Sequence, residues 1–600
     1  NICEIKRGGG VTSRVFVALN SFFSSFSRFF FSFYAFLLGF IFIVAAFVNF
    51  YYFQTYGNKI DIFIFGLKDD DTFAILSIMW HDYPLVWGIL MSLLCGIITL
   101  FAYKIPLKYN TIKERLNTTF NAIKLFIYGT IHFCLIILLI IAARGTLGTF
   151  PIKADNFHIS TLPIFNHIAT NPLMAFEWAL KDYRNNATFE EPNIERGKEL
   201  QERLFPLFHT TADSAFLKEN PPHVVLNVME SFGINALVHD RKDTNDLLGS
   251  LRKHFESDFV FYRFLSAADG TAPSFVALFF ESPNEQITLG SYKNIKLPYN
   301  PFSIYADSGY EVFYITSGYG QWQGLEDALT LMEKYPESKQ DSNSWGVPDE
   351  YVYRLAFEIL SSATKPTFIA ILTTSNHPPH LLPHTFSPMP LSFPSELADK
   401  LTQKQQENLI LPIKLYQYAN NAFGDFMDRI KQSNLAKNTI ISATGDHRLR
   451  NLGPNPNTDK ALNFSVPFYI YIPQAYQINL HYNPSRVGSH KDILPTLYAL
   501  SLSNATYMSV GGRNMLGKVD NKQYEFGFNR SVWIDDNGIY PTQAGVGYLW
   551  KDKEINTDSK KAFGLHALDE SFLLQDNKDF ENLYRELFNY SISWRIYNAK

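Results

Sequence analysis

The sequence predicts membrane-spanning helices followed by an α/β domain with a mostly parallel sheet. Three observations predict this class: long uncharged apolar runs in the first quarter of the chain, short apolar runs alternating with amphipathic ones after residue 221, and closely spaced strands over 524–550. A hydrophobic content of 46% in 600 residues is enough to bury a large core. The 53 basic and 57 acidic residues nearly balance, so we expect no nucleic-acid partner.

Three apolar runs near the N-terminus are each long enough to cross a hydrocarbon layer, and they predict spans at about 35–53, 84–103 and 125–143. Lysines and arginines gather before the first run and between the second and third, which predicts a cytoplasmic location for both segments. We therefore expect a multi-pass transmembrane domain over 1–154 that delivers the rest of the chain to the outer side. Because the first residue is Asn1 and not Met, the sequence allows for an upstream portion with further spans. An added pair of spans would leave the predicted orientation of residues 144–600 unchanged.

Residues 155–220 form a predicted helical linker. Apolar residues recur at intervals of three and four in 171–183 and in 194–205, which predicts two amphipathic helices. These helices could lie along the membrane surface as a connector, or they could pack on the outer domain. The sequence leaves both alternatives open.

The outer domain, 221–600, contains the alternating pattern. Because helix-length segments separate most of the predicted strands, we expect a mostly parallel sheet covered on both faces, with ligands at the carboxyl ends of its strands. Segments 524–534 and 538–550 predict a small antiparallel subdomain near the C-terminus. The strands predicted for the main sheet are 223–229, 259–266, 311–316, 366–374, 438–445 and 466–472.

Polar residues follow three of these predicted strands. Glu230 ends the first, Thr271 lies in a predicted turn after the second, and Asp446 with His447 follows the run that ends at residue 445. The carboxyl ends of strands in such a sheet converge on one edge, so these side chains would meet there. Individually, an acid such as Glu230 could cap a helix, and Thr271 could be an ordinary turn residue.

Two carboxylates, an imidazole and a hydroxyl together suit one divalent cation, with Mn²⁺ favoured and Mg²⁺ or Zn²⁺ as alternatives. A threonine hydroxyl is a poor nucleophile at neutral pH, but a neighbouring cation would stabilise its alkoxide. Gly270 and Pro273 on either side of Thr271 predict a tight turn that presents the hydroxyl outward. Arg448, beside the Asp-His pair, could steady a phosphate or form an exposed ion pair.

Several motifs, in this order along the chain, resemble the lipoteichoic acid synthase and membrane phosphoglycerol transferase group of the sulfatase and alkaline phosphatase superfamily. The resemblance covers most of the chain. It implies an alkaline-phosphatase-like α/β sandwich in a bacterial inner (cytoplasmic) membrane protein, with the catalytic domain on the periplasmic or extracellular side. The motifs are NPLMAF, VVLNVMESFG, DGTAPSF, WGVPDEYVY, TTSNHPPH, ATGDHR and GSHKDILPTLYAL.

The resemblance also implies roles for particular residues. It makes Glu230, Asp446 and His447 metal ligands, and it makes Thr271 both a ligand and the residue that becomes covalently loaded. His377 matches a position that contacts the substrate phosphate or head group in this family.

Two further substrate contacts are implied, together with one departure from the family pattern. Trp322 matches a tryptophan of the segment that binds glycerol phosphate, and His490 matches a histidine often kept by relatives that move phosphoethanolamine. Ile315 and Gly324 stand where that segment often carries a histidine and an arginine. Because of this departure, the resemblance does not fix the identity of the head group or of the acceptor.

The resemblance implies a metal-dependent transferase that moves phosphoglycerol from a phosphatidylglycerol-like lipid to a glycan, lipid or polymer acceptor through a phosphothreonine-type intermediate. Phosphoethanolamine transfer by the same chemistry is the alternative. Sulfatase or phosphodiesterase activity and a non-catalytic membrane scaffold are weaker hypotheses. Thr271 itself argues against a sulfatase, because sulfatases need a Cys or Ser that matures to formylglycine.

Overall fold

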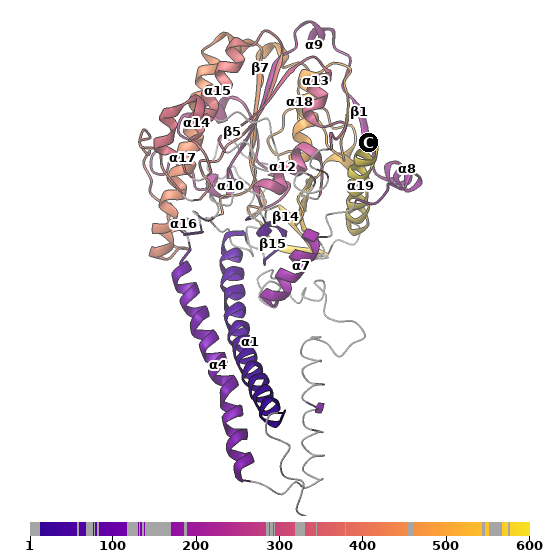
Figure 1. The fold of residues 1–600 in the computed structure, drawn as a ribbon. Coiled ribbons are helices and arrows are strands. Elements are labelled where there is room, and N and C mark those ends of the chain that lie inside the picture. The colour runs from indigo at the N-terminus through magenta and orange to yellow at the C-terminus, as the bar shows by residue number, and fades with distance from the viewer. Residues whose placement is uncertain are drawn as a thin grey trace, which may run out of the picture. The chain divides into compact units, whose positions relative to one another are not determined.

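The chain folds into two structural units, coloured along the sequence in Figure 1. The first comprises Asn1–Phe65 and Met79–Arg184, and the second comprises Gly66–Ile78 and Asn185–Lys600. The computed structural model describes residues 12–56, 59–65, 67, 76, 79–80, 83–116, 130, 133–134, 137, 170–184, 189–283, 287, 292, 295–318, 331–343, 345–378, 380–450, 452, 461–542, 546–550, 567–573 and 577–599.

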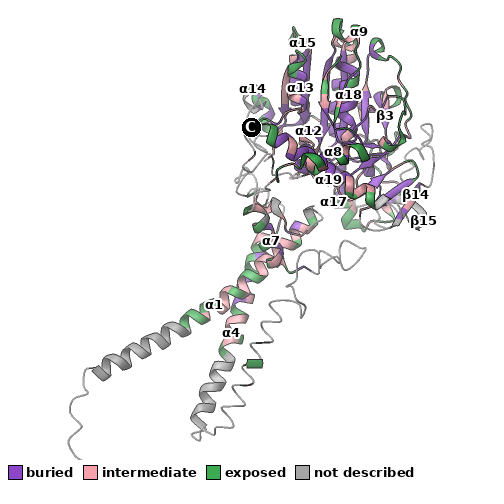
Figure 2. Cartoon of the chain, turned by 90° about the vertical axis from the view of Figure 1, so that its right-hand side faces the viewer, coloured by how far each residue is buried: buried purple, intermediate pink, exposed green. Residues whose placement is uncertain are grey.

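Two long apolar helices dominate the first unit: α1 (Thr12–Tyr56) and α4 (Leu85–Leu116). Their segments Phe29–Gln54 and Leu85–Lys104 are long and apolar enough to cross a membrane. Most of their described side chains are exposed or only partly buried, as Figure 2 shows. These helices contain the predicted first and second spans, whereas most of the predicted third span lies outside the described residues.

The two predicted linker helices are present, and they belong to different units. Helix α7 (Pro172–Arg184) is in the first unit, where the ring of Tyr183 stacks on Phe65 with centroids 4.3 Å apart. Helix α8 (Ile194–Arg203) is in the second unit, where Arg196 binds both carboxylate oxygens of Glu586 at 2.7 and 2.6 Å. Of the two alternatives, packing on the outer domain describes α8.

A six-stranded sheet forms the centre of the second unit, in the order β3-β8-β7-β2-β6-β5. Strand β2 pairs in parallel with β6 and β7, and β5 pairs in parallel with β6, which confirms the predicted mostly parallel sheet. Strand β8 alone runs against its neighbours β7 and β3. The strands are β2 (His223–Met229), β3 (Phe259–Phe261), β5 (Glu311–Thr316), β6 (Thr367–Leu372), β7 (Thr439–Gly445) and β8 (Phe468–Tyr471).

Helices cover both faces of this sheet, as Figure 1 shows. Val225 of β2 belongs to a core shared with α15 (Asp349–Ser362) and α17 (Gln403–Lys431). The alternate residues Val224 and Leu226 belong to a second core. The helices of that second core include α12 (Thr271–Phe280), α13 (Pro301–Asp307) and α18 (Ile493–Ser501). This alternation places one central strand between two apolar layers.

The predicted strand 259–266 is divided in two. After β3, the short β4 (Phe264–Leu265) leaves the main sheet and pairs in parallel with β9 (Gly488–Ser489). Arg263 lies at the division, only 1% exposed, with its guanidinium 4.7 Å from the ring centroid of Trp550. A buried arginine stacked on tryptophan cannot occupy the apolar interior of the main sheet, so the run does not continue as one strand.

A second, antiparallel sheet follows near the C-terminus and confirms the predicted subdomain. Its strands, in sheet order, are β11 (Gly527–Phe528), β12 (Val532–Ile534), β13 (Gly538–Pro541), β14 (Val546–Trp550) and β15 (Ala567–Leu573), and α19 (Asn577–Asn598) comes after them. Within the described residues, the other α-helices and strands are β1 (Phe208–Thr210), α9 (Ala215–Glu219), α10 (Ile234–Leu237), α11 (Arg252–Ser257), α14 (Leu331–Lys334), α16 (Ser395–Ala398) and β10 (Thr506–Met508).

Candidate metal and nucleophile site

Two neighbouring strands deliver the three candidate metal ligands. Glu230 follows β2, and Asp446 with His447 follows β7. The parallel pairing sets Met229 opposite Gly445, so all three side chains emerge at one edge of the sheet. A Cβ at position 445 would lie 2.3 Å from the carbonyl oxygen of Phe232, so a glycine is required for this close approach.

Glu230, Asp446 and His447, here called the triad, offer ligand atoms that all lie within 4.8 Å of one another. They are 4%, 0% and 1% exposed. The Nε2 atom of His447 is 3.5 Å from Oε1 of Glu230 and 3.5 Å from Oδ2 of Asp446. Because Nδ1–H of His447 donates to the carbonyl oxygen of Arg448 at 2.8 Å, the Nε2 lone pair faces the carboxylates.

Ser231 ties the two carboxylates together. Its backbone N–H donates to Oδ1 of Asp446 at 2.8 Å, and its hydroxyl donates to Oε1 of Glu230 at 2.8 Å. Its φ of 58° is in the left-handed region, which costs a non-glycine residue on the order of 1–3 kcal/mol. The N–H of His447 also donates to Oδ1 of Asp446, at 2.7 Å. The strained backbone of Ser231 therefore orients both carboxylates.

Thr271 is the first residue of α12 and not part of a turn. The predicted tight turn is corrected to a helix start, because Gly270 caps α12 in an extended conformation and Pro273 is accepted in a first helical turn. The Thr271 hydroxyl donates to Oε2 of Glu230 at 3.1 Å and lies 3.5 Å from Nε2 of His447. The positive end of the helix dipole lies at this hydroxyl and favours negative charge there.

The residues present fit a divalent cation. Two carboxylates, an imidazole nitrogen with its lone pair inward and a hydroxyl form the donor set. The buried Oδ2 of Asp446 receives no hydrogen bond of normal geometry from the described part of the chain. Buried acceptors of this kind require a partner, and a cation held by the triad would supply it.

Burial and mutual charge shift the pKa values within the triad. Burial, together with the charge of Glu230, raises the pKa of Asp446 well above its ordinary value. Burial also lowers the pKa of His447 to about 3, which keeps the imidazole neutral and able to bind a metal. Although burial raises the pKa of Glu230, other interactions, among them the charge of Arg450 and the hydrogen bond from Ser231, outweigh it and lower that pKa to about 2.

The loop after β6 brings histidines toward the triad. Thr373, at the start of this loop, accepts a hydrogen bond from the N–H of Glu230 at 3.1 Å. His377 packs its ring on Trp345 with centroids 4.1 Å apart, and its Nδ1–H donates to the carbonyl oxygen of Pro378 at 2.6 Å. The N–H of His377 donates to the carbonyl oxygen of Thr374 at 2.9 Å, so His377 lies on the same short turn as Thr373, which contacts Glu230.

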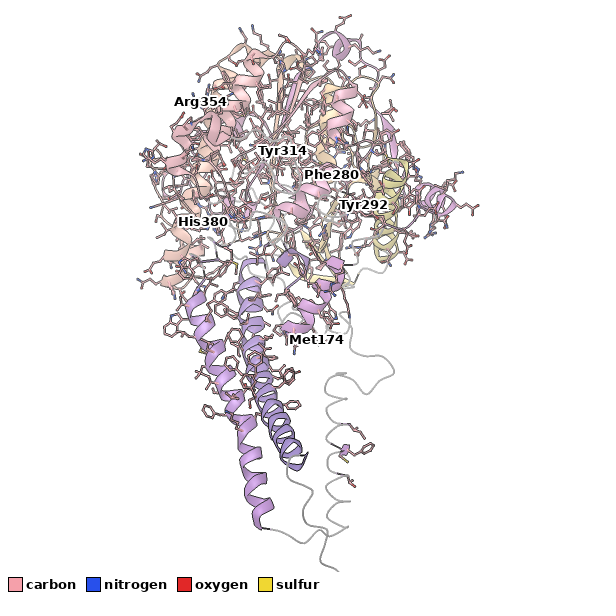
Figure 3. All side chains as sticks on the ribbon, in the orientation of Figure 1. Met174, Phe280, Tyr292, Tyr314, Arg354 and His380 are labelled. Carbon is pink, nitrogen blue, oxygen red and sulfur yellow. The ribbon has the colours of Figure 1, made fainter. Side chains whose placement is uncertain are left out.

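Two further positions, Trp322 and His380, differ in how the prediction compares with the structure. Trp322 lies outside the described residues. His380, labelled in Figure 3, was not among the predicted site residues, yet it interacts electrostatically with both His377 and Glu230. Burial lowers its pKa to about 4, and neither ring nitrogen has a hydrogen-bond partner among the described residues. Its place near the triad depends on how the loop folds back, which no local sequence signal reveals.

His490 is 1% exposed and has both ring nitrogens engaged by backbone groups. Its Nε2–H donates to the carbonyl oxygen of Gly445 at 2.9 Å, and its Nδ1 accepts from the N–H of Ala267 at 3.3 Å. These contacts place His490 behind the triad, where it joins the end of β7 to the segment that precedes Thr271. Ile315 is buried in the core with 0% exposure, so it does not replace a substrate-binding histidine.

Comparison with known proteins is consistent with this arrangement. Residues 222–501 match the family model described as Sulfatase. No significant match is found among curated protein sequences.

Three similar solved structures share 13–18% identity with this chain. A protein in the alkaline phosphatase superfamily from Vibrio parahaemolyticus is 18% identical (68% of this chain, 97% of that chain, TM-score 0.46). The lipoteichoic acid synthase of Listeria monocytogenes is 15% identical (66% and 98%, TM-score 0.45). The integral membrane lipooligosaccharide phosphoethanolamine transferase of Neisseria meningitidis is 13% identical (82% and 86%, TM-score 0.48).

Proposed function

Because residues 222–501 match the Sulfatase family model, we propose that this chain is a metal-dependent membrane phosphotransferase. It takes a phosphoglycerol group from a phosphatidylglycerol-like lipid and passes it to a hydroxyl of a glycan, lipid or polymer acceptor. Thr271 carries the group between the two steps. One observation carries the proposal: the Thr271 hydroxyl lies 3.1 Å from Glu230 and 3.5 Å from His447, within a buried set of metal-ligand types.

Glu230, Asp446, His447 and Thr271 would hold one divalent cation, with Mn²⁺ favoured and Mg²⁺ or Zn²⁺ as alternatives. Such a cation neutralises charge on phosphoryl oxygens and lowers the pKa of a neighbouring hydroxyl. The chain's own residues prepare the same hydroxyl. Oε2 of Glu230 accepts its hydrogen bond, and the N-terminus of α12 favours the negative charge that develops there.

The reaction proceeds by two displacements at phosphorus. In the first, Oγ of Thr271 bonds to phosphorus, the bond from phosphorus to the diacylglycerol oxygen breaks, and the threonine proton leaves on the diacylglycerol hydroxyl. In the second, an acceptor hydroxyl oxygen bonds to phosphorus and the bond to Thr271 breaks. The acceptor's proton then restores the threonine hydroxyl, so the protein is unchanged after both steps.

The two apolar N-terminal helices support a membrane location, which brings the domain close to a lipid donor. We place the protein in a bacterial cytoplasmic membrane as a multi-pass protein with residues 221–600 on the outer side. The location of Lys and Arg between the predicted spans supports this orientation.

Mass spectrometry of Thr271 tests the proposal. The full chain, purified in detergent and loaded with Mn²⁺, is incubated with phosphatidylglycerol or phosphatidylethanolamine vesicles, and the peptide containing Thr271 is analysed. We expect a phosphoglycerol adduct on Thr271 that is absent from Thr271→Ala and from chelator-treated protein. The matched control Thr211→Ala removes a threonine hydroxyl elsewhere in the second unit and keeps the adduct.

Each other outcome identifies a different function. A phosphoethanolamine adduct alone would replace the donor and keep the chemistry. Turnover of an aryl sulfate without any lipid adduct would indicate a sulfatase. Absence of any adduct together with absence of bound metal would overturn the enzyme proposal and favour a membrane scaffold.

A further inference from the structure

The loop after the Asp446-His447 pair brings an arginine to the start of the nucleophile helix. Nη2 of Arg450 donates to the carbonyl oxygen of Asp269 at 3.1 Å. The same atom lies 3.2 Å from where a Cβ on Gly270 would be. The guanidinium therefore packs against the two residues that directly precede Thr271, and the side chain stays partly exposed.

The neighbouring Arg448 does not take this place, although it is the arginine beside the Asp-His pair. Its Nη1 folds back onto its own loop and donates to the carbonyl oxygens of Leu449 and Arg450 at 3.4 and 3.2 Å. The arginine directed toward the start of α12 is therefore the one three residues beyond His447.

The charge of Arg450 lies near the triad. Its guanidinium packs against residues 269 and 270, and the next residue, Thr271, hydrogen-bonds Glu230 at 3.1 Å. A permanent positive charge close to three metal-ligand positions opposes the binding of a cation there. An arginine in this position therefore works against the metal unless an anion is bound as well.

Charge balance identifies that anion. The two triad carboxylates and a divalent cation cancel. At the start of α12 three arginines, Arg448, Arg450 and Arg530, act on the single carboxylate of Asp269, so positive charge is in excess there and a phosphodiester monoanion would reduce it. The planar guanidinium is the side chain best suited to phosphate oxygens.

We propose that Arg450 binds a non-bridging oxygen of the phosphate that is transferred through Thr271, and that its charge selects donors whose head group carries no positive charge. The inference rests on the proposed function, since it assumes that a phosphate comes to lie beside Thr271. It adds a residue of the 446–450 loop to the site and favours a phosphoglycerol over a phosphoethanolamine donor.

Binding of inorganic phosphate to the Mn²⁺-loaded full chain tests the inference without turnover. Isothermal titration calorimetry compares wild type, Arg450→Met, Arg450→Lys and Arg530→Met, an arginine that also faces Asp269 but donates to the carbonyl oxygen of Pro283 at 2.7 Å. We expect Arg450→Met to weaken phosphate binding roughly 10- to 100-fold, because it removes hydrogen bonds from a charged donor. Arg450→Lys loses less, and Arg530→Met binds phosphate nearly as wild type does.

The direction of the change in Mn²⁺ affinity distinguishes an arginine that binds phosphate from one that only holds the loop in place. Because Arg450 repels the cation, Arg450→Met binds Mn²⁺ as tightly as wild type or more tightly in phosphate-free buffer. An arginine that merely held the loop in place would, when removed, weaken phosphate and metal binding together, and that result would overturn the inference. Unchanged phosphate affinity in Arg450→Met, or no phosphate binding by loaded wild type, would overturn it as well.

Donor selectivity separates this inference from the proposed function. In the adduct assay, the preference for phosphatidylglycerol over phosphatidylethanolamine falls in Arg450→Met, and an unchanged preference would overturn the selectivity. If wild type binds phosphate through Arg450 but forms no adduct on Thr271 with any lipid, the proposed transfer fails while the anion site stands.

Discussion

The triad and the residues around it differ in how the fold holds them. The triad is at most 4% exposed and lies at the ends of two hydrogen-bonded parallel strands. The rim, defined here as His377, His380 and Arg450, is partly exposed and lies on the loops that follow β6 and β7. The triad is fixed by the sheet, whereas His377 is held by a ring contact with Trp345 and Arg450 by a hydrogen bond to Asp269.

This difference assigns separate tasks to separate parts of the molecule. Ligand positions at strand ends cannot move without breaking sheet hydrogen bonds, so they suit a metal that must be held the same way in every cycle. Loop positions tolerate change at lower cost, so they suit the recognition of a particular head group. We therefore expect substitutions in the triad to affect metal binding and substitutions in the rim to affect donor binding.

The largest expected effect comes from Asp446→Asn. The amide keeps the shape and the acceptor for the Ser231 and His447 N–H groups, but it removes the charge that a cation needs. Outer-shell partners of metal ligands are worth 10- to 100-fold in affinity, so loss of a ligand charge should weaken Mn²⁺ binding by about 100-fold or more. Equilibrium dialysis measures this, with His377→Gln as the rim control that keeps its metal. Equal loss in both variants would erase the distinction between triad and rim.

The next largest effect is that the stabilisation of the folded protein by Mn²⁺ depends on pH. Because burial raises the pKa of Asp446, the metal-free folded protein keeps this proton at a pH where the unfolded chain has released it near its ordinary value of about 3.9. The free energy of unfolding of the metal-free protein therefore falls as pH rises above that value. Metal binding requires the ionised acid, so the stabilisation by Mn²⁺ grows with pH.

Thermal unfolding with saturating Mn²⁺ and with chelator, at about pH 5.5 and about pH 8, measures this difference. His447 does not contribute to it, because its low pKa leaves the imidazole neutral in both states of the folded protein. A gap in melting temperature that stays constant with pH would mean that Asp446 is already ionised without the metal.

A smaller effect is expected for His490→Ala, which tests the support behind the triad. The change leaves the N–H of Ala267 and the carbonyl of Gly445 without their side-chain partner, at a cost of roughly 1–3 kcal/mol in the free energy of unfolding. Adduct formation on Thr271 slows at unchanged metal content, because the nucleophile segment and β7 are no longer joined. The exposed His384→Ala serves as control, and equal destabilisation by both would contradict this role.

The smallest effect is expected for Trp345→Ala, which removes a ring that packs on the rim residue His377. Its ring contact with His377 is worth about 0.5–1.5 kcal/mol, which corresponds to a several-fold weaker donor affinity. Steady-state kinetics should show a raised KM for the lipid donor at an unchanged Mn²⁺ affinity. A loss of metal in this variant would show that the rim supports the triad directly.

The same division explains what could be predicted from the sequence. Glu230, Asp446 and His447 were predicted to meet because each follows an apolar run that reads as a buried strand, and strand ends converge in a parallel sheet. The reversed direction of β8 was not predicted. It follows from the connection 446–467, which contains no helix among its described residues, so the chain returns directly beside β7.

Other features depend on contacts between distant segments. The division of 259–266 is caused by Arg263 against Trp550, which lies far along the chain. Arg450 lies against Asp269 and Gly270 only because its loop folds back toward the start of α12, and no spacing pattern encodes that path.

Ser231 links events that would otherwise be independent. One residue in a left-handed conformation hydrogen-bonds both acids, so a change at that single backbone position would disturb Glu230 and Asp446 together, although the N–H of His447 also holds Asp446. The geometry of one metal ligand is therefore coupled to that of the other through a residue that is itself not a ligand.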